Sequence, residues 1–276
     1  MLKKHKTYQV SNSNIFKNQL INYLRDFNCV CFLDSNSISL SNSFDFLAAF
    51  KKKEKLRNVK QPFLELNNML NHKRDWLFGY LGYDLKNDIE PLNSNNSDYQ
   101  KFPKIHFFSP DFIIKVKKNT VTIIHDYSYS RNQIDAIFKQ IIDLEIPEIL
   151  NPIVQIKARV DKEHYIRNIL KIQEHLQAGD IYEMNYCQEF YAEKIDLDPF
   201  NLFIKLNDTS QAPFSALYRI DSYYCLCASP ERYLKKEGSK IISQPIKGTV
   251  SRLDNKILDE ENKKKLLNSS KDFSEN

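Results

Sequence analysis

Hydrophobic residues in the first 150 positions alternate between the spacing of helices and that of strands, which predicts a mixed α/β arrangement. Apolar residues three and four positions apart predict a helix at 14–24, with Asn14 as its cap. The apolar run CVCFLD at 29–34 predicts a buried strand that ends in a polar turn. The other elements expected in this half are a short strand or helix at 44–50, strands at 104–108, 111–117 and 120–125, and a helix at 131–144.

The second half opens on a clearer helical pattern. Apolar residues at helical spacing lie between Asp161, a suitable N-cap, and Gly179, which suits the left-handed position after a helix. The elements expected next are a strand at 181–192, a helix that starts at Asp198–Pro199, an antiparallel meander of strands at 214–219, 223–228 and 239–244, and a charged helix at about 254–267.

A length of 276 residues allows one large domain or two modest ones. Two prolines, Pro147 and Pro152, follow the last helix expected in the first half. They mark the best candidate boundary, so we expect two domains, 1–150 and 151–276.

Glycine is scarce, with only 5 in the chain, so each glycine is expected where another residue would fit poorly. Gly248 directly follows Lys247 in a polar stretch, an arrangement that lets the backbone approach a ligand while an amine points at it. Gly79 and Gly82 lie among aromatic residues at 75–90. There they indicate either close packing of a strand or one wall of a small-molecule pocket.

Composition excludes several classes of protein. The formal charge of +5 is mild and spread along the chain, which does not favour nucleic-acid binding. The N-terminus has no apolar segment typical of a signal peptide, and no apolar run is long enough to span a membrane, so we expect a cytoplasmic protein.

Four of the five cysteines form two pairs at strand spacing, Cys29 with Cys31 and Cys225 with Cys227. Such pairs could hold zinc, but reduced cysteines that act as small buried hydrophobic residues are the favoured interpretation. The six histidines show no ligand spacing, so a histidine-based metal site is not expected.

Glu231 and Lys247 are the residues most suggestive of chemistry. They lie at strand ends on the two sides of one expected hairpin. The pair fits a surface ion pair, which contributes at most about 1 kcal/mol. It also fits a desolvated, nucleophilic lysine beside a carboxyl group that acts as a general acid.

Several motifs, in order along the chain, resemble those of the chorismate-utilising enzymes, which include anthranilate synthase component I and aminodeoxychorismate synthase component I. They are FLDS at 32–35, WLFGYLGYD at 76–84, GDIYEMNYCQEF at 179–190, SPE at 229–231 and PIKGT at 245–249. The resemblance implies an α+β fold, a multi-layered α/β sandwich whose second half carries the chorismate site.

The resemblance also assigns roles to individual residues. Aminodeoxychorismate synthases have a lysine at the position of Lys247, where anthranilate synthases usually have alanine. Lys247 would therefore attack chorismate while Glu231 protonates the departing hydroxyl, which is transaminase-type chemistry in folate (para-aminobenzoate) biosynthesis. Gly248 and Thr249 would contact the substrate, and Glu275 would bind Mg²⁺. With no glutaminase cysteine evident, ammonia would come from a separate glutamine amidotransferase subunit.

This chain departs from the family pattern in three places. Glu183 stands where isochorismate and salicylate synthases carry a lysine, which argues against that branch, although glutamine is usual in the amine-forming branches. The regulatory segment NPSPY is replaced by QAPF at 211–214, a change that bears on tryptophan binding.

The third departure is at the end of the chain, where SSKDFSEN at 269–276 resembles a segment that continues further in the family. The second metal-binding glutamate, the catalytic histidine, and the carboxylate-binding arginine and tyrosine have no counterpart. We therefore expect a sandwich incomplete at its C-terminus. The hypotheses are the front portion of an aminodeoxychorismate synthase component I, an anthranilate synthase component I, and a truncated, non-catalytic chain that binds a partner subunit.

Overall fold

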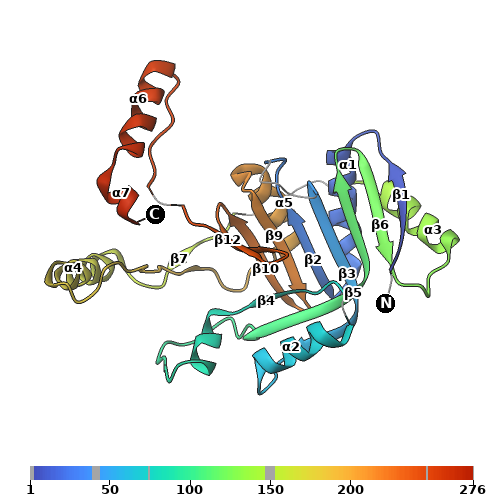
Figure 1. Cartoon of the computed structure of the whole chain (residues 1–276), viewed down its shortest axis with the longest axis horizontal. Helices are drawn as coiled ribbons and strands as arrows, with labels where there is room; N and C mark the ends of the chain where they lie inside the picture. Colours follow the sequence, from blue (N-terminus) through green and yellow to red (C-terminus); the bar gives the residue numbers. More distant parts are fainter. Residues whose placement is uncertain (1–2, 39–43, 74, 147–152, 247, 276) are drawn as a thin grey trace. The chain divides into compact units, whose positions relative to one another are not determined.

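The computed structural model describes residues 3–38, 44–73, 75–146, 153–246 and 248–275 (Figure 1). The chain divides into two compact units, Met1–Pro147 together with Leu202–Asn276, and Glu148–Asn201. The boundaries of these units differ from those of the predicted domains, 1–150 and 151–276. The difference arises because strands from the second half of the sequence join the sheet of the first half.

The larger unit is built on an antiparallel sheet in which the described residues form eight strands. Its strand order is β1-β6-β5-β3-β2-β9-β10, and β4 pairs with β5 beside this path. The strands are β1 (Lys4–Gln9), β2 (Cys29–Asp34), β3 (Phe46–Arg57), β4 (Phe78–Leu81), β5 (Ile105–Lys117), β6 (Thr120–His125), β9 (Phe214–Ile220) and β10 (Tyr223–Ser229).

The predicted buried strand at 29–34 is confirmed as β2, which lies inside the sheet between β3 and β9. Its pairing with β9 sets Phe32 opposite Leu217 and Asp34 opposite Ser215. Because β2 is flanked on both edges, its backbone groups are satisfied by its neighbours, and an unbroken apolar sequence is tolerated there.

Three helices, α1 (Ser13–Tyr23), α3 (Arg131–Ile142) and α5 (Pro199–Ser210), cover one face of this sheet (Figure 1). Phe16 of α1 lies 6.0 Å from Phe138 of α3 between ring centroids, and Phe32 lies 5.8 Å from Phe203 of α5. The structure corrects the expected cap of α1. Asn12, not Asn14, accepts the hydrogen bonds from the first free backbone amides.

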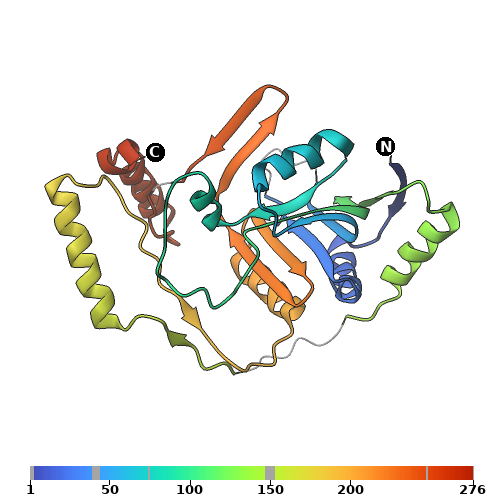
Figure 2. The same cartoon turned by 90° about the horizontal axis from the view of Figure 1, so that it is seen from below.

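Helix α2 (Pro62–Lys73), which the sequence pattern did not predict, packs with the opposite side of the sheet (Figure 2). Its Leu66 and Met69 contact a small core of Leu56, Leu85 and Ile105. Strand β1 was also not predicted, since its sequence KHKTYQ is mostly polar. It forms by pairing with β6, and Tyr8 stacks on Phe138 with 4.0 Å between ring centroids.

The two strands predicted at 104–108 and 111–117 are one strand, β5. Pro110 interrupts the pattern but not the strand, because the register of β3 shifts between Lys52 and Glu54 opposite this proline. A bulge of this kind accommodates a residue that has no N–H to donate. The segment 44–50, predicted as a short strand or helix, corresponds to the first part of strand β3.

Gly79 and Gly82, in the aromatic segment, allow two strands to pack closely, which is the first of the two interpretations given above. A Cβ atom on Gly79 would lie 2.2 Å from the His106 carbonyl oxygen, and one on Gly82 would lie 2.8 Å from that of Lys104. Strand β4 pairs with β5 at this point, so a side chain would push the two backbones apart. A 3₁₀ helix, η2 (Tyr83–Asp88), follows.

The predicted meander is only partly right. β9 and β10 pair as expected, but β11 (Arg232–Glu237) pairs with β12 (Lys240–Gln244) in a separate two-stranded sheet. Pro230 stands between β10 and β11, and a residue without a backbone N–H cannot extend the ladder. The charged helix predicted at 254–267 is confirmed as α6 (Lys256–Leu267), and α7 (Ser270–Glu275) follows it.

In the smaller unit, helix α4 (Lys162–Ala178) has the predicted signals at both ends. Asp161 accepts a hydrogen bond of 2.7 Å from the His164 amide, and Gly179 is left-handed with φ 80°. The strand predicted at 181–192 is wrong over most of its length. Only β8 (Phe190–Tyr191) forms in this range. Its sole described partner, β7 (Lys157–Ala158), has two residues, so the pairing extends no further. None of the described helices in either unit is long and apolar enough to cross a membrane.

Candidate functional site

The β11–β12 hairpin organises the residues that the sequence analysis selected. Arg232, the first residue of β11, pairs with Gln244, the last of β12, and its Nε donates a 2.8 Å hydrogen bond to the Gln244 side chain. Glu231 directly precedes β11, and the segment 245–249 directly follows β12. The hairpin therefore brings Glu231 and Pro245 to the same open end.

Glu231 is exposed, and its backbone is held by Ser229. The Ser229 hydroxyl donates a 3.1 Å hydrogen bond to the Glu231 carbonyl oxygen and accepts one of 3.4 Å from the Glu231 amide. This turn orients the backbone and leaves the carboxyl group accessible. The predicted nucleophile, Lys247, lies outside the described residues, so its geometry relative to Glu231 stays a prediction.

Gly248 is where glycine is required in this segment. Its φ of 73° is left-handed, and a Cβ atom there would lie 2.7 Å from Leu266 Cδ1 and 2.8 Å from the Asp272 carboxyl carbon. Any larger residue would be strained and would collide with α6 and α7. The backbone of Gly248 lies close to the side chain of Asp272, and its predicted approach to a ligand stays a prediction.

Thr249 is exposed, and Glu275 ends α7 with its side chain outside the described part of the structure. Asp272 lies three residues before Glu275 on the same helix, so the two positions share a face. The structure therefore places the segment at 248 next to the helix that carries the predicted magnesium ligand. Asp272 was not selected from the sequence, although it belongs to the SSKDFSEN motif.

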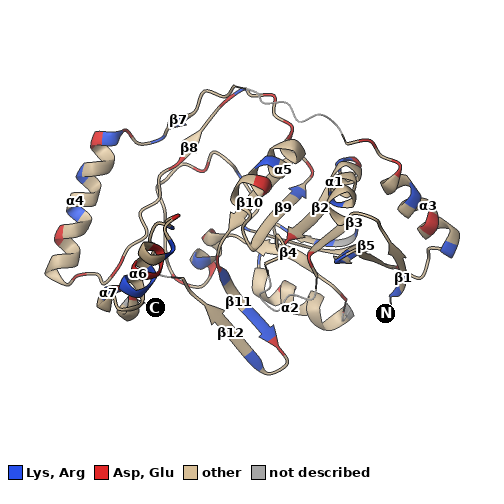
Figure 3. Cartoon of the chain, turned by 90° about the horizontal axis from the view of Figure 1, so that it is seen from above, with Lys and Arg blue, Asp and Glu red and all other residues tan. Residues whose placement is uncertain are grey.

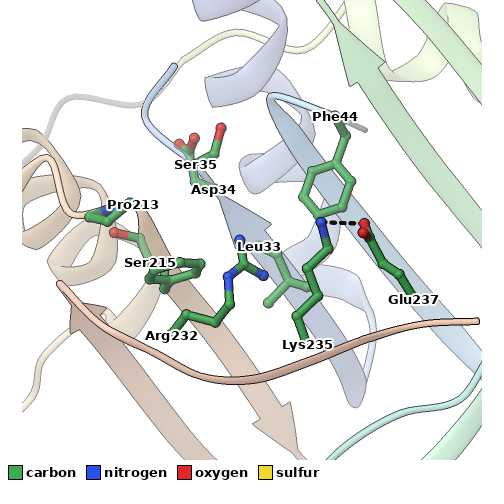
Figure 4. A pocket seen from close by; sticks show the side chains of 10 residues that line it. Leu33, Asp34, Ser35, Phe44, Pro213, Ser215, Arg232, Lys235 and Glu237 are labelled. Atoms are coloured by element: carbon green, nitrogen blue, oxygen red, sulfur yellow. Dashed lines mark ion pairs between the residues drawn. The ribbon is translucent and has the colours of Figure 1, made fainter. Parts of the chain in front are cut away.

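A cavity of about 360 Å³ lies beside the hairpin, between the end of β2, the start of β9 and β11 (Figure 4). Arg232, Lys235 and Glu237 extend into it from β11, and Lys235 forms a 2.5 Å ion pair with Glu237. The other lining residues are Leu33, Asp34, Ser35, Phe44, Pro213, Phe214 and Ser215. Its apolar wall and charged rim suit a small molecule with both polar and apolar parts.

The structure thus joins two motifs that are about 180 residues apart. FLDS at 32–35 and QAPF at 211–214 both border this cavity. The contribution of β11 to the cavity was missed, because nothing in the local sequence shows which strand lies across from it.

A buried polar network holds the cavity wall in place. The carboxylate of Asp34, 3% exposed, accepts hydrogen bonds of 2.7 Å from Lys17 Nζ and 2.9 Å from Asn207 Nδ2. Asn36 donates to the Asn207 side chain at 2.9 Å and to the Ala212 carbonyl at 2.8 Å. This network connects α1, β2, α5 and the turn before β9, so the FLDS motif acts through Asp34 as a structural anchor.

The two cysteine pairs differ in burial. Cys29 and Cys31 are buried, as expected for small hydrophobic residues, and burial raises the pKa of the Cys29 thiol to about 12. Cys225 is exposed and Cys227 half-buried. Among the described residues, no group of three or more His, Cys, Asp or Glu side chains is arranged to hold a metal ion.

Comparisons with known proteins identify relatives of this chain. The chain is 38% identical to aminodeoxychorismate synthase component 1 of Escherichia coli (strain K12) over 120 residues, which cover 44% of this chain and 26% of that protein. It is 30% identical over 216 residues to a probable anthranilate synthase component 1 of Schizosaccharomyces pombe, covering 71% of this chain and 44% of that protein. The chain thus spans less than half of either relative.

The fold is that of a solved structure, anthranilate synthase component I from Streptococcus pneumoniae. The superposition has a TM-score of 0.67 at 18% identity and covers 86% of this chain and 60% of that one. The predicted α+β class and fold type are confirmed. The sequence profile described as "chorismate binding enzyme" matches residues 21–276, and the chain therefore belongs to the chorismate-binding enzyme family.

Proposed function

We propose that this chain carries the lysine and glutamate of an aminodeoxychorismate synthase component 1, which converts chorismate and ammonia to 4-amino-4-deoxychorismate. The observation that supports it most is Lys247 in the PIKGT segment, together with the 38% identity to the Escherichia coli aminodeoxychorismate synthase component 1. The β11–β12 hairpin supports the proposal, since Glu231 directly precedes β11 and Pro245 directly follows its partner strand β12.

In the proposed reaction, the amine of Lys247 attacks carbon 2 of the chorismate ring. Glu231 protonates the 4-hydroxyl, which leaves as water as the two ring double bonds shift from C1=C2 and C5=C6 to C1=C6 and C4=C5. Ammonia then adds at carbon 4, both double bonds return to C1=C2 and C5=C6, and the lysine amine is expelled from carbon 2. The sum is chorismate plus ammonia giving 4-amino-4-deoxychorismate plus water, so no oxidant or reductant is required.

Two features of the hairpin suit these roles. The exposed carboxyl of Glu231 can reach a ligand at the open end, and its backbone is held by Ser229. Gly248 and Thr249 follow the lysine, where they can offer backbone and hydroxyl groups to the substrate. The left-handed backbone conformation of Gly248 turns the chain sharply directly after Lys247 in the sequence.

The proposal includes a magnesium ion, which Glu275 would bind. Carboxylate oxygens are the donors that Mg²⁺ prefers, and the carboxyl group of Asp272, on the helix that Glu275 ends, lies beside Gly248. When bound, the ion would neutralise a substrate carboxylate. The ammonia source in the proposal is a separate glutamine amidotransferase subunit, and glutamine-dependent turnover by this polypeptide alone would contradict that part.

The deciding experiment compares wild type with Lys247→Ala under saturating chorismate, with ammonium and Mg²⁺, and product separation by chromatography. Because the chain spans less than half of its aligned relatives, both this chain and the longest polypeptide that its reading frame encodes are assayed. Loss of a covalent route should reduce aminodeoxychorismate formation to near the detection limit. Lys240→Ala, an exposed lysine on the same hairpin, is the matched control. An unchanged rate in Lys247→Ala would sink the proposal.

Anthranilate formation is the second candidate, because the Schizosaccharomyces pombe relative aligns over 71% of this chain. The same assay separates the two activities, since anthranilate is fluorescent and aminodeoxychorismate is not an aromatic product. Anthranilate as the main wild-type product would replace the proposed activity. If neither product forms with the longest polypeptide, the hypothesis of a non-catalytic chain that binds a partner subunit is favoured.

A further inference from the structure

A second cavity, of about 470 Å³, lies on the larger unit at the start of α3, beside β1 and the end of β6. It is distant in sequence from every motif used above. The side chains around it that matter here are Lys4, Lys6, His125, Ser130 and Arg131. Its size falls within the range of small-molecule sites.

The lining of this cavity is cationic and contains no aspartate or glutamate. Lys6 is paired with Asp135, whose carboxylate also interacts electrostatically with Arg131, whereas Lys4 has no ion pair among the described residues. Lys4 lies 5.0 Å from the ring centroid of Tyr127, which leaves its ammonium group able to contact an anion. Figure 3 shows both basic and acidic positions on α3. The local charge therefore favours a negatively charged ligand.

The start of α3 contributes to the same potential. This helix has 12 residues, no acidic residue in its first turn, and a capping box in which Ser130 accepts from the Gln133 amide. The positive end of the helix dipole is thus not balanced by a carboxylate in the first turn of the helix. Backbone amides of a first turn bind phosphate groups readily in other proteins.

His125 is the independent observation that points to a ligand. It is only 4% exposed, and its Nδ1 donates a 2.9 Å hydrogen bond to the Asp126 carbonyl oxygen. Its Nε2 has no hydrogen-bond partner among the described residues, and the side chain lines the cavity. A ring nitrogen that lines the cavity without a protein partner is available to bond to a ligand there. Nε2 can accept from a P–OH group or, when protonated, donate to a phosphate oxygen.

We propose that this cavity binds a phosphate group, either inorganic phosphate or the phosphate of a small phosphomonoester. Lys4 and Arg131 supply the charge, the first turn of α3 supplies backbone donors, and Nε2 of His125 contacts one oxygen. The proposal is independent of the chorismate chemistry, because none of these residues lies on β11, β12 or α7.

The test is a calorimetric titration of the full chain at pH 7, with ionic strength held constant by chloride. Inorganic phosphate and glycerol 3-phosphate are titrated separately, which distinguishes the free ion from an ester. One saturable site is expected for at least one of them. Arg131→Gln and Lys4→Gln should each weaken binding by about tenfold or more, since each removes a charge-assisted contact.

Lys139→Gln is the matched control, because it removes the same charge from the exposed end of the same helix. Its affinity should equal that of wild type, and circular dichroism should show all variants folded. In a histidine-labelled sample, the His125 imidazole resonances should move on phosphate addition while those of exposed His164 stay in place. The proposal is wrong if neither compound saturates, if Lys139→Gln weakens binding as much as Arg131→Gln, or if the His125 resonances do not respond.

Discussion

His106 allows a quantitative test of how tightly the core of the larger unit is closed. It lies on β5, is 1% exposed, and its Nδ1 is 2.7 Å from the Tyr218 hydroxyl, while its Nε2 is buried without a partner. Burial lowers the pKa of this imidazole to about 4, and the positive charge of Arg57 on the adjacent strand lowers it further in the same direction. His106 is therefore neutral in the folded protein at pH 5 to 7.

The sign of the pH dependence follows from these values. The unfolded chain binds a proton at His106 near the ordinary pKa of 6.5, whereas the folded chain does not until about 4. The unfolded state thus binds more protons between these values, and stability falls as the pH is lowered. From pH 7 to pH 5 the linkage relation gives a loss of about 2 kcal/mol from this residue alone.

The perturbation is His106→Gln, which cannot titrate but can still hydrogen-bond to Tyr218. Urea unfolding of both proteins at pH 7, 6 and 5 is followed through the single tryptophan, Trp76. Carboxyl groups titrate in both proteins and cancel in the comparison. The stability advantage of wild type over the variant should shrink by about 2 kcal/mol between pH 7 and pH 5. Parallel pH profiles for the two proteins would refute the reasoning.

Three further predictions concern the core and the cavity wall. Gly79→Ala should destabilise the protein by about 1–3 kcal/mol in urea unfolding, because the new methyl group would collide with the backbone of β5; unchanged stability would mean that β4 is not packed as described. Asp34→Ala should cost about 3 kcal/mol or more, because it leaves the Lys17 amine without its buried partner, and Lys17→Met/Asp34→Leu should recover part of this loss. Cys31 is buried and its thiol pKa is raised by burial, so a thiol reagent should modify exposed Cys187 within minutes and Cys31 only on unfolding, as read by mass spectrometry; equal labelling of both would contradict the burial.

The sequence by itself determined those elements whose signals are local. The helix between Asp161 and Gly179 was predicted with both caps, since its end signals depend on hydrogen bonds within a few residues. The buried strand at 29–34 was equally clear, because a short run of five apolar residues before a polar turn is typical of a strand flanked on both sides. The family also followed from the sequence, since its motifs are short and occur in order.

Only the tertiary structure decided how distant segments pair. No local pattern shows that β2 pairs with β9, that β11 leaves the meander to pair with β12 alone, or that a bulge in β3 lets β5 run through Pro110. Pairing of strands far apart in the chain depends on which apolar faces can be buried together, and that is a property of the whole sheet.

The candidate site divides in the same way. Glu231 and the 245–249 segment could be selected from the sequence, because a hairpin between them is a local feature. The Asp34 network and the cavity beside β11 could not, since their residues come from four separate parts of the chain. A carboxyl group at the end of an otherwise apolar strand was the one sequence signal for that network. Its partners, on α1 and α5, became apparent only once the helices were placed on the sheet, because a buried charge is stable only where the fold supplies its hydrogen bonds.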